Sequence, residues 1–108
     1  MKRGDVVTVA LPGALGKPRP AVVVQADIVP PSFRTVTLLP LTSDVQGAPA
    51  FRVTVEPSPA NGLRKVSQVM VDKVSTHLRE KLGPVIGSLD ENTMSRVTRT
   101  LAVWLGIA

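Results

Sequence analysis

The chain has 108 residues, of which 44% are hydrophobic and 19% charged, with no cysteine, a single histidine and a formal net charge of +5. This size suits one domain around one core, and the composition excludes a disordered chain, a disulfide framework and a thiolate or multi-histidine metal site. No apolar run approaches the roughly 18 residues of a membrane-spanning helix, so we expect one globular domain over residues 1–108 without a membrane segment.

The basic balance favours anionic partners such as nucleic acid, acidic peptides or a membrane face. The start of the chain, Met1-Lys2-Arg3 before a weak apolar stretch, shares some features with a secretory leader. Asp5 and the pair Pro12-Gly13 interrupt that stretch, which favours a first β-strand instead. We therefore expect a cytoplasmic protein.

Five segments are expected to form strands because they are rich in β-branched residues or alternate in polarity. Segment 21–25 is continuous and apolar apart from Gln25, which predicts a central strand buried on both faces. Pro40 has no N–H for a ladder bond, so it predicts an edge or a strand end near Thr42. The expected strands are residues 6–11, 21–25, 35–39, 51–55 and 66–71, with loops at 29–32, 43–49 and 57–62.

One helix is expected at the end of the chain, because apolar residues recur there at the spacing of a single helix face. Those residues are Met94, Val97, Leu101, Trp104 and Leu105. Ser88 with Glu91 predicts a capping box at the start of the helix, and Gly106 predicts its end. Residues 76–83 fit either a helical turn or a loop. Short strands, turns and a terminal amphipathic helix together predict a mainly β small barrel closed by a C-terminal α-helix.

The segment Lys17-Pro18-Arg19-Pro20 is unusual for the stiffness of its backbone. Each proline restricts its own φ and pushes the preceding residue out of the α region, so Arg19 has little backbone freedom. A rigid base lowers the entropy that an arginine loses when it binds a ligand. The plainer interpretation is a loop fastened to the second strand, with Arg19 solvated.

Polar groups also follow two of the expected strands. Thr42, Ser43 and Asp44 come where the third strand becomes a loop, and they either present hydroxyls to a ligand or bond to their own backbone in a turn. Asp72 follows the fifth strand, where its carboxylate either forms an ion pair or transfers protons. Only 3% of residues are aromatic and none is tyrosine, which excludes a sheet that holds RNA bases by stacking.

Five segments occur in a recognisable order along the chain. They are Arg3-Gly4-Asp5-Val6, Pro18-Arg19-Pro20 with the apolar residues 21–24, Pro40-Leu41-Thr42-Ser43, Phe51-Arg52-Val53 and the helix entry 87–94. In this order they resemble the MazF/PemK-like toxins, and the resemblance covers nearly all residues.

The resemblance implies an SH3-like barrel with a C-terminal helix, usually a homodimer, that acts as a ribosome-independent endoribonuclease on single-stranded RNA. It implies no metal and no cofactor, because a 2′-hydroxyl attacks the neighbouring phosphorus and leaves a cyclic phosphate and a free 5′-hydroxyl. The implied partner is an acidic, partly disordered antitoxin that folds over the basic groove.

The resemblance also implies the site residues. Arg19 matches the family's functional arginine, whose guanidinium can hold two phosphate oxygens as negative charge builds. Thr42 matches the active-site threonine, and Asp72 matches an aspartate proposed for catalysis in some members. We expect the catalytic residues to be Arg19, Thr42 and Asp72, and the RNA-binding residues to be Lys17, Ser43 and Gln68.

Two departures from the family pattern are visible. Met70 stands where the members with the catalytic aspartate have an arginine, two residues before Asp72. The loop 12–18 is shorter than usual and lacks the acidic and additional basic residues common there. Substrate preference is therefore not carried over from a relative.

Two other classes compete with the ribonuclease. A CcdB-like toxin poisons DNA gyrase and cuts no RNA. Val24-Gln25-Ala26-Asp27-Ile28 is similar to its second strand, and Trp104-Leu105-Gly106-Ile107 is similar to its Trp-Gly-Ile ending with one residue inserted. The third class is a noncatalytic basic SH3-like module, although the low aromatic content argues against a groove for proline-rich peptides.

Overall fold

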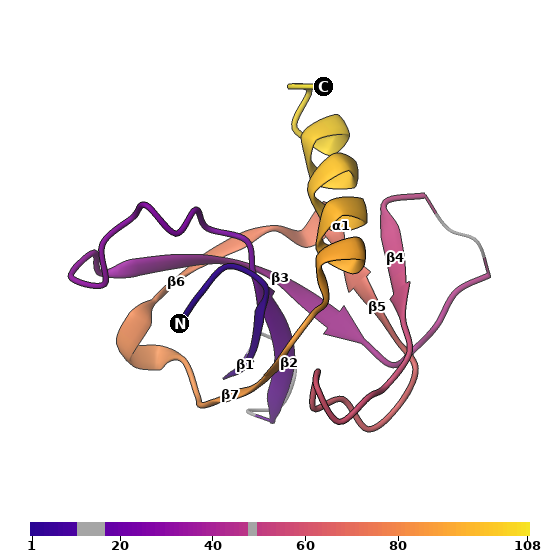
Figure 1. Ribbon diagram of the computed structural model, residues 1–108, viewed down its shortest axis with the longest axis horizontal. Helices are drawn as coiled ribbons and strands as arrows, with labels where there is room; N and C mark the ends of the chain where they lie inside the picture. Colours follow the sequence, from indigo (N-terminus) through magenta and orange to yellow (C-terminus); the bar gives the residue numbers. More distant parts are fainter. Residues whose placement is uncertain (11–16, 48–49) are drawn as a thin grey trace.

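The computed structural model describes residues 1–10, 17–47 and 50–108. Within them, a seven-stranded sheet is followed by a C-terminal helix, which confirms the expected mainly β fold as a half-barrel (Figure 1). The strands lie in the order β4-β5-β3-β2-β1-β7, and β6 pairs with β3. The elements are β1 Asp5–Ala10, β2 Pro18–Val23, β3 Thr35–Thr42, β4 Arg52–Val55, β5 Ser67–Met70, β6 Ser75–Leu78, β7 Val85–Ser88 and α1 Glu91–Trp104, with 3₁₀ turns η1 Val71–Lys73 and η2 Arg79–Lys81.

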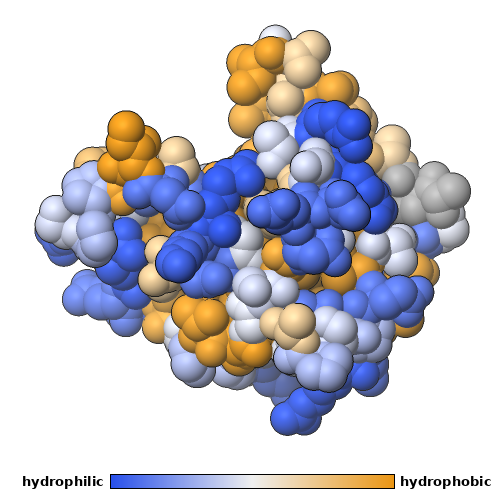
Figure 2. Space-filling model, in the orientation of Figure 1, coloured by the Kyte–Doolittle hydropathy of each residue, from blue (hydrophilic) through white to orange (hydrophobic). Residues whose placement is uncertain are grey.

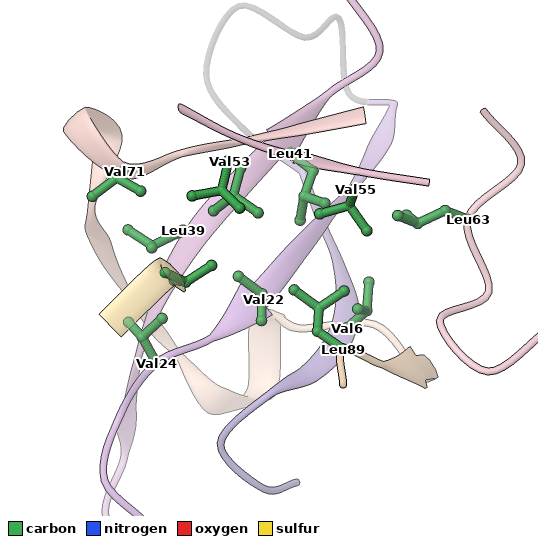
Figure 3. Close-up of a cluster of buried hydrophobic side chains, with 12 residues drawn as sticks. Val6, Val22, Val24, Leu39, Leu41, Val53, Val55, Leu63, Val71 and Leu89 are labelled. Atoms are coloured by element: carbon green, nitrogen blue, oxygen red, sulfur yellow. The ribbon is translucent and has the colours of Figure 1, made fainter. Parts of the chain in front are cut away.

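The three strands β1, β2 and β3 have apolar residues on both faces, because successive side chains of a strand point in opposite directions. Val22 and Leu39 belong to a larger core that α1 covers (Figure 3). Ala21 and Leu38 belong to a smaller core on the opposite face. The prediction of a central strand buried on both faces is thus confirmed for residues 21–23, whereas the predicted bounds are wrong, because β2 begins at Pro18 and ends at Val23.

The apolar face of α1 packs against the larger core. Val97 is fully buried there, and Met94 and Leu101 are partly buried against it. Trp104, the last helical residue, contacts Phe51. Leu105 lies beyond the helix and is 53% exposed, so the prediction that it joins the core face is wrong.

The two ends of α1 are set by local hydrogen bonds. At the start, the N–H of Thr93 donates to the carboxylate of Asp90 over 2.7 Å, so Asp90 is the N-cap. Ser88 is not, because it is the last residue of β7 and pairs with β1. At the other end, Gly106 has a φ of +76° and its N–H donates to Val103, while Ile107 donates to the carbonyl of Ala102. This arrangement confirms the end predicted at Gly106.

Pro40 lies inside β3 and is buried. On one side it is opposite Ala21 of β2. On the other side, residues 35–38 pair with β6 and residues 41–42 pair with β5, so Pro40 falls between the two pairings. No neighbouring strand requires its missing N–H at that point. The strand end predicted near Thr42 is confirmed, and β3 continues through Pro40 for two residues before it ends.

Several elements differ from the sequence-based expectations. Residues 76–83, expected as a helical turn or a loop, contain most of β6 followed by η2, and β7 was not expected. The fifth strand is shorter than predicted because η1 begins at Val71. At Gly87 a side chain would overlap the backbone of Asn61, so this strand needs a glycine where the β4–β5 loop crosses it. Leu11 and most of the loop 12–18 lie outside the described residues.

Candidate functional site

Arg19 and Thr42 lie at the same end of the β2–β3 pair. The last paired residues at that end are Ala21 and Pro40. Arg19 precedes Ala21 by two positions, and Thr42 follows Pro40 by two positions. Because residues two apart share a face, both side chains project from the face of the smaller core. Arg19 is exposed and Thr42 is partly buried. The fold therefore brings two of the predicted catalytic residues to one place.

The backbone around Arg19 is held by the sheet as well as by its prolines. The segment Pro18-Arg19-Pro20 begins β2, and Arg19 is paired with the buried residue Val9 of β1. The guanidinium thus extends from a rigid base at the rim of the sheet. Lys17, immediately before β2, is also exposed and adds a second positive charge at this end.

The hydroxyl oxygen of Thr42 accepts a hydrogen bond within a turn. The N–H of Asp44 donates to its Oγ1 over 3.1 Å. A threonine hydroxyl that accepts in this way keeps its own hydrogen for another acceptor. The turn and the ligand-binding interpretations of this segment are therefore compatible, and Ser43 next to it is exposed.

Gln68 occupies the centre of the same face but is buried, with only 2% of its surface exposed. It lies opposite Thr42 of β3 on one side and Thr54 of β4 on the other. Its amide Nε2 donates to the carbonyl of Gln46 and to Thr54, and its Oε1 accepts from the N–H of Gln46. The side chain is occupied by the chain itself, unlike the RNA-facing side chain that we expected.

Asp72 is exposed in η1, outside the β3–β5 ladder. The residue opposite Thr42 in that ladder is Gln68, and Asp72 follows Gln68 by four positions. Arg19 and Thr42 therefore come from neighbouring ends of β2 and β3, whereas Asp72 comes from a third element.

A further cation on this face was missed by the sequence-based prediction. The register of β4 and β5 places Arg52 opposite Met70 and Thr54 opposite Gln68. Directly opposed residues share a face, so Arg52 lies on the same side of the sheet as Thr42. The strict alternation in 51–55 was the signal for it, because Arg52 and Thr54 are the polar residues of that strand.

With this geometry in view, comparison with known proteins identifies the family. A model of the PemK-like, MazF-like toxins of type II toxin-antitoxin systems matches residues 2–105. The chain belongs to this toxin family. A probable endoribonuclease MazF from Mycolicibacterium smegmatis is 45% identical over 109 residues, covering 100% of this chain and 99% of the relative.

Solved structures of MazF proteins share the fold of this MazF-like toxin. The Mycobacterium tuberculosis toxin MazF-mt6 matches with a TM-score of 0.81 and 25% identity, covering 96% of this chain and 98% of that one. An endoribonuclease in complex with its cognate antitoxin, from a mycobacterial species, matches with a TM-score of 0.83 and 22% identity, covering 100% and 97%. A MazE–MazF structure from Deinococcus radiodurans matches with a TM-score of 0.77 and 22% identity, covering 100% of this chain and 98% of that one. The expected family and fold are confirmed, and the CcdB-like alternative is not favoured.

In the part of the chain that the structure describes, no three His, Asp or Glu side chains gather in a way that could hold a metal ion. His77 instead shares a hydrogen bond of 2.9 Å between its Nε2 and the hydroxyl of Ser75. Among residues 1–10, 17–47 and 50–108, no helix has the length and apolar character needed to span a membrane.

Proposed function

We propose that this toxin cuts single-stranded RNA by attack of a 2′-hydroxyl on the neighbouring phosphorus, and so inhibits translation and growth. Endoribonuclease is the enzyme class of the family and of the 45% identical relative, and it is the class of this chain. The observation that carries the proposed chemistry is the placement of Arg19 and Thr42 at one end and on one face of the β2–β3 pair.

In the proposed step the 2′-oxygen forms a bond to phosphorus and the bond from phosphorus to the 5′-oxygen breaks. The 2′-hydroxyl gives up its proton and the leaving 5′-oxygen gains one, which leaves a cyclic phosphate and a free 5′-hydroxyl. Negative charge grows on the phosphate oxygens in between. Fixed donors that are aimed at this charge lower the barrier without a metal ion.

Arg19 is the proposed stabiliser of that charge. Its guanidinium keeps its proton and offers a fork of donors that fits two phosphate oxygens. Thr42 donates its remaining hydroxyl hydrogen to the same phosphate or orients the attacking oxygen. Lys17 and Ser43 bind the adjacent phosphates and sugars, and Arg52 adds positive charge on the same face.

Asp72 is the proposed proton acceptor for the 2′-hydroxyl, and this is a separate claim. Its carboxylate is exposed and therefore open to bound RNA. Because it lies in η1, outside the β3–β5 ladder, and because Met70 precedes it, its role does not follow from the Arg19–Thr42 placement. A substitution at Asp72 tests it independently.

The proposed partners are an acidic antitoxin and a second copy of the chain. A net charge of +5 favours an acidic polypeptide, and a structural neighbour was solved with its cognate antitoxin. Apolar residues gather at the exposed end of α1, seen at the top of Figure 2, where a second copy would cover them. They are Val103, Trp104, Leu105 and Ile107. Since the proposed substrate is RNA, we place the toxin in the cytoplasm.

The test is to incubate the purified protein with RNA of mixed sequence in the presence of EDTA. Cleavage that leaves cyclic-phosphate and 5′-hydroxyl ends supports the proposal. Cleavage that needs an added divalent cation, or that leaves other ends, contradicts the proposed chemistry. Gyrase-dependent DNA damage would indicate a CcdB-like poison, and RNA binding without cleavage would indicate a noncatalytic module.

A further inference from the structure

The segment that follows Thr42 is attached at both of its ends to a single residue. Thr42 is paired with Gln68 in the β3–β5 ladder. Four residues later, the backbone of Gln46 comes back over the Gln68 side chain and bonds to it in both directions. The N–H of Gln46 donates to Oε1 over 3.0 Å, and Nε2 donates to the carbonyl of Gln46 over 2.9 Å. The carboxamide thus pairs with Gln46 much as another strand would.

The third bond of this amide fixes its direction. Nε2 also donates to the hydroxyl of Thr54 over 3.2 Å, from the strand on the other side of β5. Both amide hydrogens and the amide oxygen therefore have partners, as burial of a polar group requires. The amide has one stable orientation, and the backbone of Gln46 has one matching position.

From this arrangement we propose that Gln68 is a positioning residue for RNA cleavage, which holds the segment 42–46 so that the Thr42 hydroxyl faces the phosphate. This inference rests on the proposed function. The hydroxyl of Thr42 accepts from the N–H of Asp44, so the conformation of the turn determines the orientation of this hydroxyl. The turn lies between the two attachments to Gln68, and Ser43 within it is exposed to solvent.

The effect of Gln68 on catalysis can be measured separately from its effect on the stability of the fold, because the segment that it holds lies on the surface. Residues 43–47 are exposed, so water can replace the bonds to Gln46 when the amide is lost. The segment then gains freedom while the sheet below it remains paired. A displacement of about 1 Å at a reacting group lowers the rate by as much as ~10²-fold.

The chain contains a matched control for this substitution. Gln25 makes the same kind of clamp in the β2–β3 loop: its Nε2 donates to the carbonyl of Thr35 over 3.0 Å, and its Oε1 accepts from the N–H of Thr37 over 3.1 Å. These contacts lie at the opposite end of β3 from Thr42. The substitutions Gln68→Met and Gln25→Met therefore both remove a pair of bonds to the backbone of a neighbouring segment, one beside the candidate site and one far from it. Gln68→Met also removes the bond to Thr54.

The experiment measures kcat and KM for RNA cleavage, together with hydrogen exchange of segment 42–47, in the native protein and both variants. We expect Gln68→Met to lower kcat about tenfold to hundredfold with little change in KM, and to speed exchange at Gln46. Gln25→Met should leave both unchanged. Native kcat in Gln68→Met, or an equal loss in Gln25→Met, overturns the inference. A native protein that cleaves no RNA overturns the proposed function itself, and with it this inference.

A second variant serves if Gln68→Met does not fold. Gln68→Glu keeps the shape of the side chain, and only its protonated form can donate to the carbonyl of Gln46. Burial raises the pKa of a carboxyl group, so this form is reached on mild acidification. The ratio of variant to native kcat should rise as the pH falls. A ratio that stays constant with pH contradicts a positioning role for the donated hydrogen bond.

Discussion

Phe51 and Trp104 meet edge to face, with ring centroids 5.1 Å apart and ring planes inclined by 64°. The contact joins the residue before β4 to the last residue of α1. Phe51 has a φ of +60°, a conformation that a bulky residue rarely adopts, and its carbonyl accepts from the N–H of Val71 over 3.0 Å. The aromatic pair thus helps to hold a strained backbone at the start of β4.

This pair should contribute measurably to stability. In a double-mutant cycle with Phe51→Leu and Trp104→Ala, we expect a coupling free energy of about 0.5–1.5 kcal/mol, because edge-to-face pairs stabilise beyond the area that they bury. Urea unfolding of the four proteins gives the coupling. Strictly additive effects of the two substitutions would show that the rings pack independently.

The cap of α1 should make part of the stability depend on pH. Hydrogen bonds from Thr93 hold the pKa of Asp90 below its usual value, with a smaller contribution from the charge of Arg96. A lowered pKa in the folded state means that the stabilisation is present above the unfolded pKa of about 4 and is lost as the pH falls through the folded pKa.

Thermal unfolding of the native protein and of Asp90 variants at different pH values tests the role of this cap. Asp90→Ala should lower Tm at neutral pH, and the difference from the native protein should shrink at a pH well below the unfolded pKa of about 4. Asp90→Asn is the control, since asparagine caps a helix without titrating. A native-to-Ala difference that is equal at both pH values would contradict an ionised cap.

Substitution of Arg19 tests the proposed chemistry directly. Arg19→Ala should lower kcat by roughly 10²–10³-fold, the usual effect of losing one donor to a developing oxyanion, and leave Tm nearly native because the side chain is exposed. Arg19→Lys should fall in between, because it keeps the charge but loses the fork. The control is Arg34→Ala, an exposed arginine at the far end of β3. Full activity in Arg19→Ala would remove Arg19 from the mechanism.

Thr42 should matter less than Arg19. Thr42→Val removes the hydroxyl but keeps the β-branched shape, so it loses one donor to the phosphate and one acceptor for the N–H of Asp44. We expect a smaller fall in kcat than for Arg19→Ala, measured in the same cleavage assay. Thr76→Val is the control, because that hydroxyl bonds to Thr37 in the β3–β6 pair, at the opposite end of β3 from Thr42. Equal effects of the two substitutions would argue that Thr42 acts only through the fold.

Asp72 can be tested without reference to the other two residues. If it accepts the proton of the 2′-hydroxyl, Asp72→Asn should lower kcat by about 10²–10⁴-fold. Glu80→Gln, an exposed carboxylate in η2, is the control for loss of one negative charge. Single-turnover cleavage of a defined RNA measures both. Native rates in Asp72→Asn would assign the proton transfer to another group or to water.

The apolar end of α1 should mediate self-association. Val103→Glu places a charge in that exposed patch and should raise the dissociation constant of the dimer by at least about tenfold, since an unpaired buried carboxylate costs several kcal/mol. Ile28→Glu is the control, because Ile28 is 90% exposed and lies in the β2–β3 loop. Sedimentation over a dilution series measures both. An unchanged dissociation constant in Val103→Glu would place the dimer surface elsewhere.

Some features of this protein were determined by residues that are neighbours in the sequence. The apolar run in 21–24 produces a strand buried on both faces, and the spacing of Met94, Val97 and Leu101 produces the buried face of α1. Gly106 ends that helix because it adopts a positive φ without strain. Such features depend on local conformational preference and on a periodicity that is visible in one segment.

Other features were decided only by the pairing of segments far apart in the chain. β6 and β7 are short and partly exposed, and they form because β3 and β1 offer partners. The β3–β5 register pairs the buried Gln68 with Thr42 and leaves Asp72 outside the ladder, while the β4–β5 register places Arg52 opposite Met70. A shift of the pairing register by one residue would move every side chain of the strand to the opposite face of the sheet. Long-range register, which no single segment contains, therefore determines which polar side chains lie exposed on this face and which hold the chain in place.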